Sequence, residues 1–136
     1  PDNPLRGRNE DHFGPRFPDM SEPYHPKLRA MALEIAKQKG ITCHEGVYVS
    51  VAGPNLETKA EYKYLRLIGG DAVGMSTVPE IIVANHLKLK VAAVSVLTDE
   101  CDPDQLKPVN ISEIIEMAAK AEPNMITLFK ELIYKI

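Results

Sequence analysis

The sequence predicts an α/β domain with a mostly parallel or mixed, twisted sheet flanked by helices. From residue 21 onward, segments with helical spacing of apolar residues alternate with short β-branched segments, which is typical of this fold class. The segment 90–97 is apolar almost throughout, as in a parallel strand that helices cover on both faces. With 136 residues, the chain is long enough for one domain with a sizeable core.

The first twenty residues are predicted to be irregular. They contain four prolines, two glycines and three arginines and show no periodicity. This composition fits a flexible leader or linker, and equally an ordered loop cut out of a larger protein. We therefore divide the chain into an irregular segment, 1–20, and an α/β part, 21–136.

The first helix is predicted to run to about Lys39, because apolar residues recur at helical spacing between residues 28 and 36. Ser21 or Asp19 is expected to cap its start, and Gly40 is expected to end it. Two prolines near its start fit only in or before the first turn.

The middle of the chain is predicted to form a strand, a helix, a strand and a helix at residues 46–52, 58–68, 71–75 and 77–87. The first strand alternates and is rich in β-branched residues, and a Gly-Pro pair ends it. Each helix starts with a threonine followed three residues later by a glutamate, which is the pattern of a capping box. These pairs are Thr58 with Glu61 and Thr77 with Glu80.

The last third of the chain is predicted to contain a strand, a loop and a helix. The strand spans 90–97, and the polar, Pro-containing segment that follows it reads as a loop. Asn110 is expected to open a helix that continues to the C-terminus. Pro123 lies inside this helix and is expected to kink or break it.

Composition and charge exclude several classes of protein. No apolar run approaches the roughly 20 residues that span a bilayer, so we expect no membrane partner. The formal net charge of −3 gives no basic footprint for nucleic acid. Cys43 and Cys101 form no CxxC motif, which favours a reduced, cytoplasmic protein in which both are small buried hydrophobes.

Polar side chains follow all three predicted strands. The three strand ends carry Asn55 and Glu57, then Ser76 and Thr77, then Thr98, Asp99, Glu100 and Asp102. In open α/β sheets, ligands bind outside the carboxyl ends of the strands. If the three strands are parallel neighbours, these groups converge on one edge of the sheet and form a candidate site.

Each of these residues also has an ordinary structural interpretation. Glu57 taken alone is best read as a solvated loop carboxylate, and the acidic residues 99–104 as an exposed turn. Ser76 and Thr77 fit helix caps, and Met75 fits core filling. A helix start with a hydroxyl is in addition a generic anion site, so a phosphate at Ser76 is expected.

The motifs of several enzyme classes are absent from the sequence. It contains no GxSxG, Walker or GxGxxG motif. The acidic segment lacks the glycine and the closing glutamate of an EF-hand, and the four histidines lack the spacing of metal ligands. We therefore expect no metal, and we expect any Gly-rich phosphate loop to lie outside these residues.

Three long motifs, "VAGPNLETKAE", "GGDAVGMSTVPEIIVANH" and the strand ending in Thr98-Asp99, resemble purine nucleoside phosphorylases of the trimeric class. The segment "NPLRGRNEDHFGPRFPDMSEPY" is similar to the one that precedes them in that family. The resemblance is close from Asn3 to about Val94 and looser beyond. It implies a nucleoside phosphorylase-like three-layer fold and a homotrimer. Family members are about twice as long, so residues 21–136 look like the C-terminal half of one phosphorylase domain, with the N-terminal half as a partner.

The resemblance implies a reaction with two substrates and no metal or organic cofactor. In this family inorganic phosphate attacks C1′ of a purine nucleoside while the purine leaves. The products are the free base and (deoxy)ribose 1-phosphate. Positive charge develops on the sugar and negative charge on the base, so catalysis depends on positioning and on stabilising the leaving purine.

The resemblance also implies a role for each residue at the strand ends. Glu57 matches the glutamate that accepts hydrogen bonds from N1–H and from the 2-amino group of a 6-oxopurine, because an ionised carboxylate only accepts. Ser76 matches a phosphate-binding serine. The expected neighbours of base and ribose are Leu56, Val73, Gly74, Met75 and Thr98, with Leu56 replacing a frequent phenylalanine.

Two residues depart from the family pattern. Asp99 stands where 6-oxopurine enzymes usually have asparagine, and an ionised aspartate suits a 6-amino group or a protonated N7 better than O6. Ile111 stands where many members have a histidine near the ribose 5′-hydroxyl, or it is simply the first core residue of the last helix. Both departures resemble the residues that 5′-methylthioadenosine phosphorylase has at these positions, whereas that family does not usually have a glutamate at the position of Glu57. The pattern favours a 6-oxopurine nucleoside phosphorylase with Asp99 and Glu57 as its catalytic residues; adenosine phosphorolysis and a non-catalytic nucleoside-binding module are the alternatives.

Overall fold

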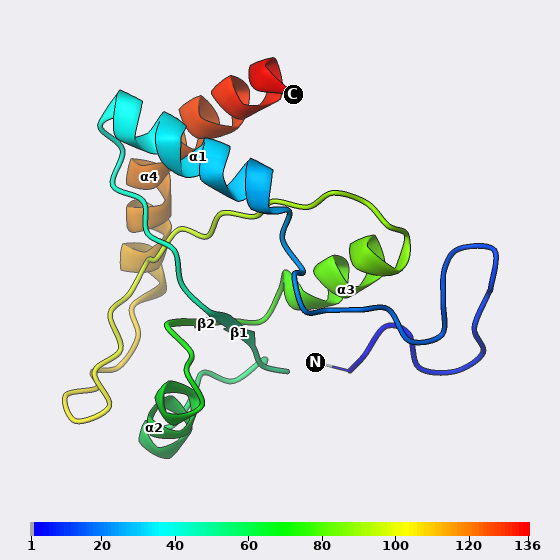
Figure 1. Cartoon of the computed structure of the whole chain (residues 1–136). Coiled ribbons are helices and arrows are strands. Elements are labelled where there is room, and N and C mark those ends of the chain that lie inside the picture. The colour runs from blue at the N-terminus through cyan, green and yellow to red at the C-terminus, as the bar shows by residue number, and fades with distance from the viewer. Residues whose placement is uncertain (1) are drawn as a thin grey trace.

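The computed structural model describes residues 2–136, which form four helices and a two-stranded sheet (Figure 1). The elements in chain order are α1 (Pro26–Lys39), β1 (Tyr48–Ser50), α2 (Lys59–Leu67), β2 (Ala72–Gly74), α3 (Val78–His86) and α4 (Ile111–Lys135). Residue 1, the first of the segment predicted to be irregular, lies outside the described residues. None of the helices in residues 2–136 is both long enough and apolar enough to cross a membrane.

The sheet is parallel, as predicted, but both strands are shorter than the sequence pattern suggests. β1 and β2 pair in the register Tyr48 with Ala72, Val49 with Val73 and Ser50 with Gly74. One further backbone hydrogen bond, from Val51 N–H to the Gly74 carbonyl, extends the pairing at the carboxyl ends. The ends of the two strands therefore lie side by side, which is where the candidate site was expected.

The predicted strand at 90–97 is not a strand in the structure. The segment is extended coil, and its sole backbone hydrogen bond within residues 2–136 runs from His25 N–H to the Val91 carbonyl. In the described chain, the two-stranded sheet consists of β1 and β2 alone, and the segment pairs with the outer edge of neither strand. The prediction of a buried parallel strand at 90–97 is therefore wrong for the described chain.

The core of the described chain lies between α1 and α4, which pack against each other beside the segment 91–97 (Figure 1). Its buried members are Ala32, Ile35, Ala36, Leu128 and Leu132. Ile35 and Leu128 are almost completely buried. Burial of side chains of this size stabilises a fold by about 1.5–3 kcal/mol each. Helical spacing in the sequence correctly predicted the buried face of α1.

α1 begins later than predicted, at Pro26, and ends as predicted at Gly40. Pro26 occupies the first turn, where its missing N–H costs nothing, and no side chain caps this start. The residues expected to cap it, Ser21 and Asp19, instead bond each other in a local turn. At the other end Gly40 takes the left-handed conformation, with φ 67°, that terminates many helices.

Pro123 bends α4 without breaking it. The helix runs from Ile111 to Lys135, and Figure 1 shows its axis changing direction between its first and second halves. Proline removes one backbone hydrogen bond and crowds the preceding turn, which is a common cause of such bends. The start of α4 is as predicted, because the Asn110 side chain accepts a hydrogen bond from Ser112 N–H over 3.0 Å.

Candidate functional site

The loop after β1 lies directly against the loop after β2. Gly53 has φ 63°, a conformation that favours glycine, and a Cβ added there would overlap the Met75 sulfur. In the strand itself, Gly74 lies against the Tyr48 hydroxyl with no room for a side chain. Close approach of backbone to side chain at both glycines therefore fixes where Val73, Gly74 and Met75 sit relative to the first loop.

Glu57 lies in the loop between β1 and α2, and the structure gives it a partner. Its Oε2 atom accepts a hydrogen bond of 2.9 Å from the Tyr62 hydroxyl, and the pair is partly buried. The interpretation of Glu57 as a solvated loop carboxylate is therefore wrong. The next glutamate, Glu61, has a different hydrogen-bond partner. It accepts hydrogen bonds from Thr58 N–H over 2.7 Å and from the Thr58 hydroxyl over 2.8 Å.

The capping box predicted at Thr58 is confirmed, and it anchors the start of α2. The Thr58 hydroxyl in turn accepts a bond from Glu61 N–H. Hydrogen bonds from the Thr58 backbone and hydroxyl lower the pKa of Glu61. Since α2 starts at a fixed residue, Tyr62 on its first turns is placed to meet Glu57.

The loop after residue 97 joins this group through Cys101. The Cys101 thiol donates to Asp99 Oδ2 over 3.8 Å, and its sulfur is also close enough to the Tyr62 hydroxyl to affect its ionisation. An ion pair of 2.6 Å between Lys63 and Asp104 adds a second tie between α2 and the same loop. The structure thus brings the first and third predicted strand ends together, although the third strand itself is not formed.

Tyr62 is held in its neutral form. Burial raises its pKa far above the ordinary value for tyrosine, and the neighbouring Cys101 and Glu57 raise it further. A neutral phenol remains a hydrogen-bond donor at every physiological pH. Both cysteines were expected to be small buried hydrophobes, but both are only half buried. Cys43 packs against the α1–α4 core, whereas Cys101 lies among polar groups.

The second strand end forms a strained turn at Thr77. Val78 N–H donates to the Ser76 carbonyl over 2.8 Å, and Thr77 between them has φ 72° and ψ −55°. This is the rare γ-turn with positive φ at its centre, an uncommon conformation for a β-branched residue. The capping box predicted for Thr77 and Glu80 is therefore wrong, because the Thr77 side chain makes no capping hydrogen bond to α3.

Strain of this kind is concentrated at functional sites, where surrounding contacts maintain it. The turn leaves the Ser76 hydroxyl exposed at the end of β2, 3.2 Å from the Thr77 hydroxyl. Two hydroxyls beside the start of α3 suit an anion. No hydrogen bond within residues 2–136 links Ser76 to Glu57 or to Asp99, so Ser76 lies at the same sheet edge without being bonded to the carboxylates.

The apolar residues expected around the base and ribose are largely open to solvent. Leu56 is 46% exposed and Met75 39% exposed, while Val73 and Thr98 are half buried. Ile111 is 61% exposed at the first turn of α4, so the interpretation of Ile111 as a core residue of this helix is wrong. Apolar surface with a few polar groups among it is the usual composition of a ligand site.

Sequence reasoning missed Tyr62 and Cys101. Neither belongs to a motif, and the spacing of five residues between Glu57 and Tyr62 crosses from a loop into a helix, where no periodicity applies. Within residues 2–136, no three His, Cys, Asp or Glu side chains come together as a metal site would require. What the geometry provides is a pair of carboxylates, Glu57 and Asp99, linked through Tyr62 and Cys101, and a separate turn at the end of β2 that carries two hydroxyls.

The carboxyl ends of parallel strands are the usual place for a ligand in an α/β fold, and comparison with known sequences identifies the family. Residues 2–134 match the phosphorylase superfamily, and the chain belongs to this family. A purine nucleoside phosphorylase from Bacillus subtilis is 44% identical over 131 residues, which is 96% of this chain and 48% of that protein.

Solved structures of schistosome enzymes show the same fold. A Schistosoma purine nucleoside phosphorylase in complex with guanosine superposes with a TM-score of 0.92 at 38% identity, covering 97% of this chain and 49% of the other. The Schistosoma mansoni enzyme in complex with adenosine gives a TM-score of 0.91 at the same identity and coverage. The chain therefore has the nucleoside phosphorylase fold, and it spans about half the length of the relatives that it matches.

Proposed function

We propose that this chain carries the purine-recognising part of a purine nucleoside phosphorylase. The reaction is reversible phosphorolysis of purine (2′-deoxy)ribonucleosides, with 6-oxopurines such as inosine and guanosine favoured. The observation that carries the proposal is the convergence of Glu57 and Asp99 through Tyr62 and Cys101 at the strand ends. The names of the relatives, and the nucleosides bound to the two schistosome enzymes, support it.

In the proposed reaction, an oxygen of inorganic phosphate forms a bond to C1′ as the bond from C1′ to N9 breaks. The bonding electrons leave with the purine, which takes up a proton. Glu57 accepts hydrogen bonds from N1–H and the 2-amino group, and Asp99 faces the position-6 and N7 edge of the base. Ser76 contacts phosphate, while Met75 and Leu56 provide apolar surface. These contacts position the base, and the proton taken up at N7 neutralises the leaving purine and gives the Asp99 carboxylate an N–H from which to accept a hydrogen bond.

The rest of the phosphate and ribose site is proposed to come from sequence that the relatives have and this chain does not cover. A groove of about 580 Å³ lies between α1, residues 41–47, the segment 91–97 and α4. Residues 92–97 have no backbone hydrogen bonds within the described chain. We propose that further strands pair there, which completes the sheet, the three layers and a Gly-rich phosphate loop.

The assembled protein is proposed to be a homotrimer and to be located in the reducing cytoplasm. It is proposed to use phosphate as co-substrate and to need no metal or organic cofactor. The trimer rests on the family resemblance, and the compartment rests on two cysteines that stay free. A second candidate function, phosphorolysis of adenosine or 5′-methylthioadenosine, is favoured by one observation, the carboxylate of Asp99 at the purine-reading edge.

The experiment that tests the proposal is a substrate panel with the complete protein. Inosine, guanosine, adenosine and methylthioadenosine are each incubated with and without phosphate, and release of the free base is measured. We expect phosphate-dependent release, fastest from the 6-oxopurine nucleosides. A non-catalytic nucleoside-binding module would release no base from any of the four, and this result would sink the proposal.

The Glu57→Ala variant tests the assigned role directly. Guanine offers two N–H groups to this carboxylate, and hydrogen bonds to charged groups contribute about 1.5–3 kcal/mol each. At about 1.4 kcal/mol per factor of ten, we expect kcat/KM for guanosine to fall roughly 100-fold or more, and that for adenosine much less. Glu34→Ala is the matched control, because Glu34 is an exposed carboxylate on α1 whose side chain bonds Gln38. Equal losses on both nucleosides in Glu57→Ala would remove the assigned role.

A further inference from the structure

Tyr62 occupies a place beside Glu57 that the purine-reading role of Glu57 does not explain. Its hydroxyl donates to Glu57 Oε2 over 2.9 Å in a partly buried setting. Its ring comes from α2, whose start is fixed by the Thr58–Glu61 capping box. A glutamate in a loop has several side-chain rotamers, and a fixed donor selects those that place Oε2 against the phenol.

We propose that Tyr62 is a positioning residue that holds the Glu57 carboxylate in the orientation required to read the N1–H edge of a 6-oxopurine. The inference rests on the proposed function and extends it to a residue outside the purine contacts. It makes Tyr62 a determinant of base preference, acting through Glu57 and not by touching the nucleoside.

The hydrogen-bonding capacity of the carboxylate allows this arrangement. Each carboxylate oxygen has two acceptor positions, so the bond from Tyr62 uses one of about four. One position on Oε2 and two on Oε1 remain for N1–H and the 2-amino group of guanine. Because burial and its neighbours keep the pKa of Tyr62 high, the phenol stays a donor and adds no second negative charge beside the purine.

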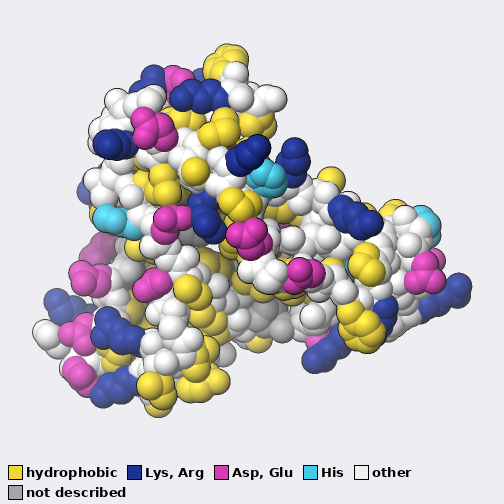
Figure 2. Space-filling view, viewed as in Figure 1, with side chains coloured by type: hydrophobic (Ala, Val, Ile, Leu, Met, Phe, Trp, Pro, Cys, Tyr) yellow, Lys and Arg dark blue, Asp and Glu magenta, His cyan; other side chains and the backbone are white. Residues whose placement is uncertain are grey.

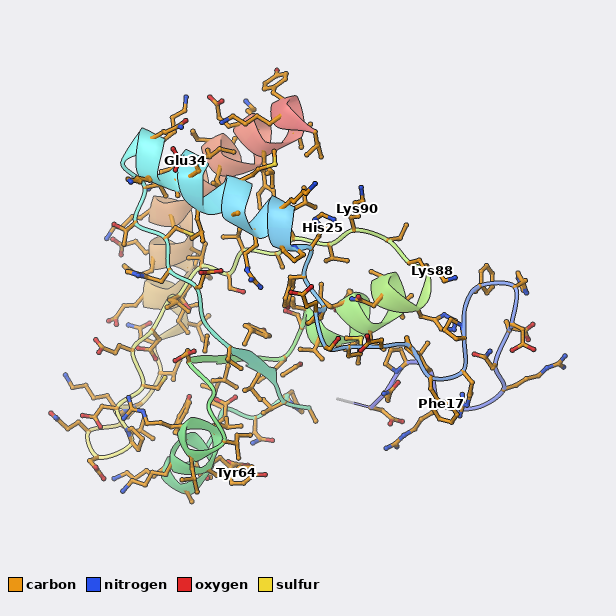
Figure 3. The ribbon with its side chains drawn as sticks, in the orientation of Figure 1. Phe17, His25, Glu34, Tyr64, Lys88 and Lys90 are labelled. Carbon is orange, nitrogen blue, oxygen red and sulfur yellow. The ribbon has the colours of Figure 1, made fainter. Side chains whose placement is uncertain are left out.

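The alternative is that the Tyr62 ring only fills space between α2 and the loop that carries Cys101. Tyr62→Phe separates the two roles, because it keeps the ring and removes the hydroxyl. Tyr64→Phe is the matched control. Tyr64 lies on the same helix, is 60% exposed and points away from the body of the chain (Figure 3). Figure 2 shows that this outer surface of α2 is a hydrophobic region, to which Leu67 and Ile68 also contribute.

The test is carried out with the complete protein, with kcat and KM measured for guanosine, inosine and adenosine. In Tyr62→Phe we expect kcat/KM for guanosine to fall about tenfold, mainly through KM, and that for adenosine to change less than twofold. Tyr64→Phe should leave all three unchanged. In a Glu57→Ala background, Tyr62→Phe should have no further effect on guanosine, because a residue that acts through Glu57 loses its role with it.

Three results would overturn the inference: an equal loss on all three nucleosides, no loss on guanosine, or unfolding of Tyr62→Phe, which would assign the hydroxyl to the fold. Failure of the proposed function looks different. There the wild-type protein itself releases no base from any nucleoside, whereas failure of the Tyr62 inference appears in a variant of an active enzyme.

Discussion

Replacement of Gly53 by alanine should disturb both the stability of the protein and its nucleoside site. Gly53 has φ 63°, and left-handed backbone costs an alanine about 1–2 kcal/mol. In addition, the new Cβ would overlap the Met75 sulfur and approach Met75 Cγ and Cε to 3.1 Å. Relief of that overlap requires the Met75 side chain to move. Overpacking of a well-packed core costs about 1–3 kcal/mol, and because Met75 is 39% exposed we expect the lower end of that range, about 1 kcal/mol.

Gly40→Ala isolates the backbone contribution. Gly40 has φ 67°, nearly the same as Gly53, but an added Cβ there meets nothing within 4 Å. The free energy of unfolding should therefore fall by about 1–2 kcal/mol in Gly40→Ala and by about 2–3 kcal/mol in Gly53→Ala. The difference between the two variants measures the contact between Gly53 and Met75.

The assay combines thermal unfolding with steady-state kinetics at one fixed protein concentration, because assembly makes the melting temperature depend on concentration. One kcal/mol corresponds to a shift of about 2–4 °C for a protein of 150–250 residues. Gly53→Ala should also raise KM for all nucleosides alike, because Met75 is expected to face the base and ribose. Equal melting temperatures and unchanged KM in the two variants would refute the reasoning.

Three other predictions concern the core, the start of α2 and the purine edge. Ile35→Ala, at a position 1% exposed between α1 and α4, should lower the free energy of unfolding by about 2–5 kcal/mol in denaturant titrations. The pKa of Glu61 is lowered from 4.5, so its bonds to Thr58 stabilise the fold above that pH and are lost as the pH falls through the lower, folded pKa. Glu61→Gln should therefore flatten the decline in melting temperature between pH 7 and pH 3. An unchanged profile would contradict this prediction. Asp99→Asn should raise the ratio of kcat/KM for inosine over adenosine, and an unchanged ratio would show that Asp99 does not read position 6.

Local signals in the sequence predicted the elements whose stability is also local. The Thr58–Glu61 box forms as predicted because all its partners lie within four residues. The same pattern at Thr77 does not form a capping box, because Thr77 is the central residue of the γ-turn at the end of β2. In this backbone conformation its side chain makes no hydrogen bond to the start of α3. α1 was predicted with its buried face and its end, but its start was set by Pro26 and not by the more distant Ser21.

Long-range features were predictable only where topology alone decides them. Parallel pairing of β1 and β2 follows from the alternation of strands and helices, and it places Glu57 and Ser76 at one edge. The segment 90–97 has a strand-like composition, but composition does not specify a pairing partner, and the segment pairs with neither β1 nor β2. The contact between Tyr62 and Glu57 depends on how α2 leaves its loop, and no residue pattern encodes that angle.

The unpaired segment 91–97 has a consequence for the chain when it is expressed by itself. The segment VAAVSVL carries no charge and no proline, and residues 93, 95 and 97 are open to solvent. Segments with this composition and free backbone groups are templates for intermolecular β-pairing. A separately produced chain would therefore be expected to self-associate through this segment, and a single lysine at Leu97 would act as a gatekeeper that opposes aggregation.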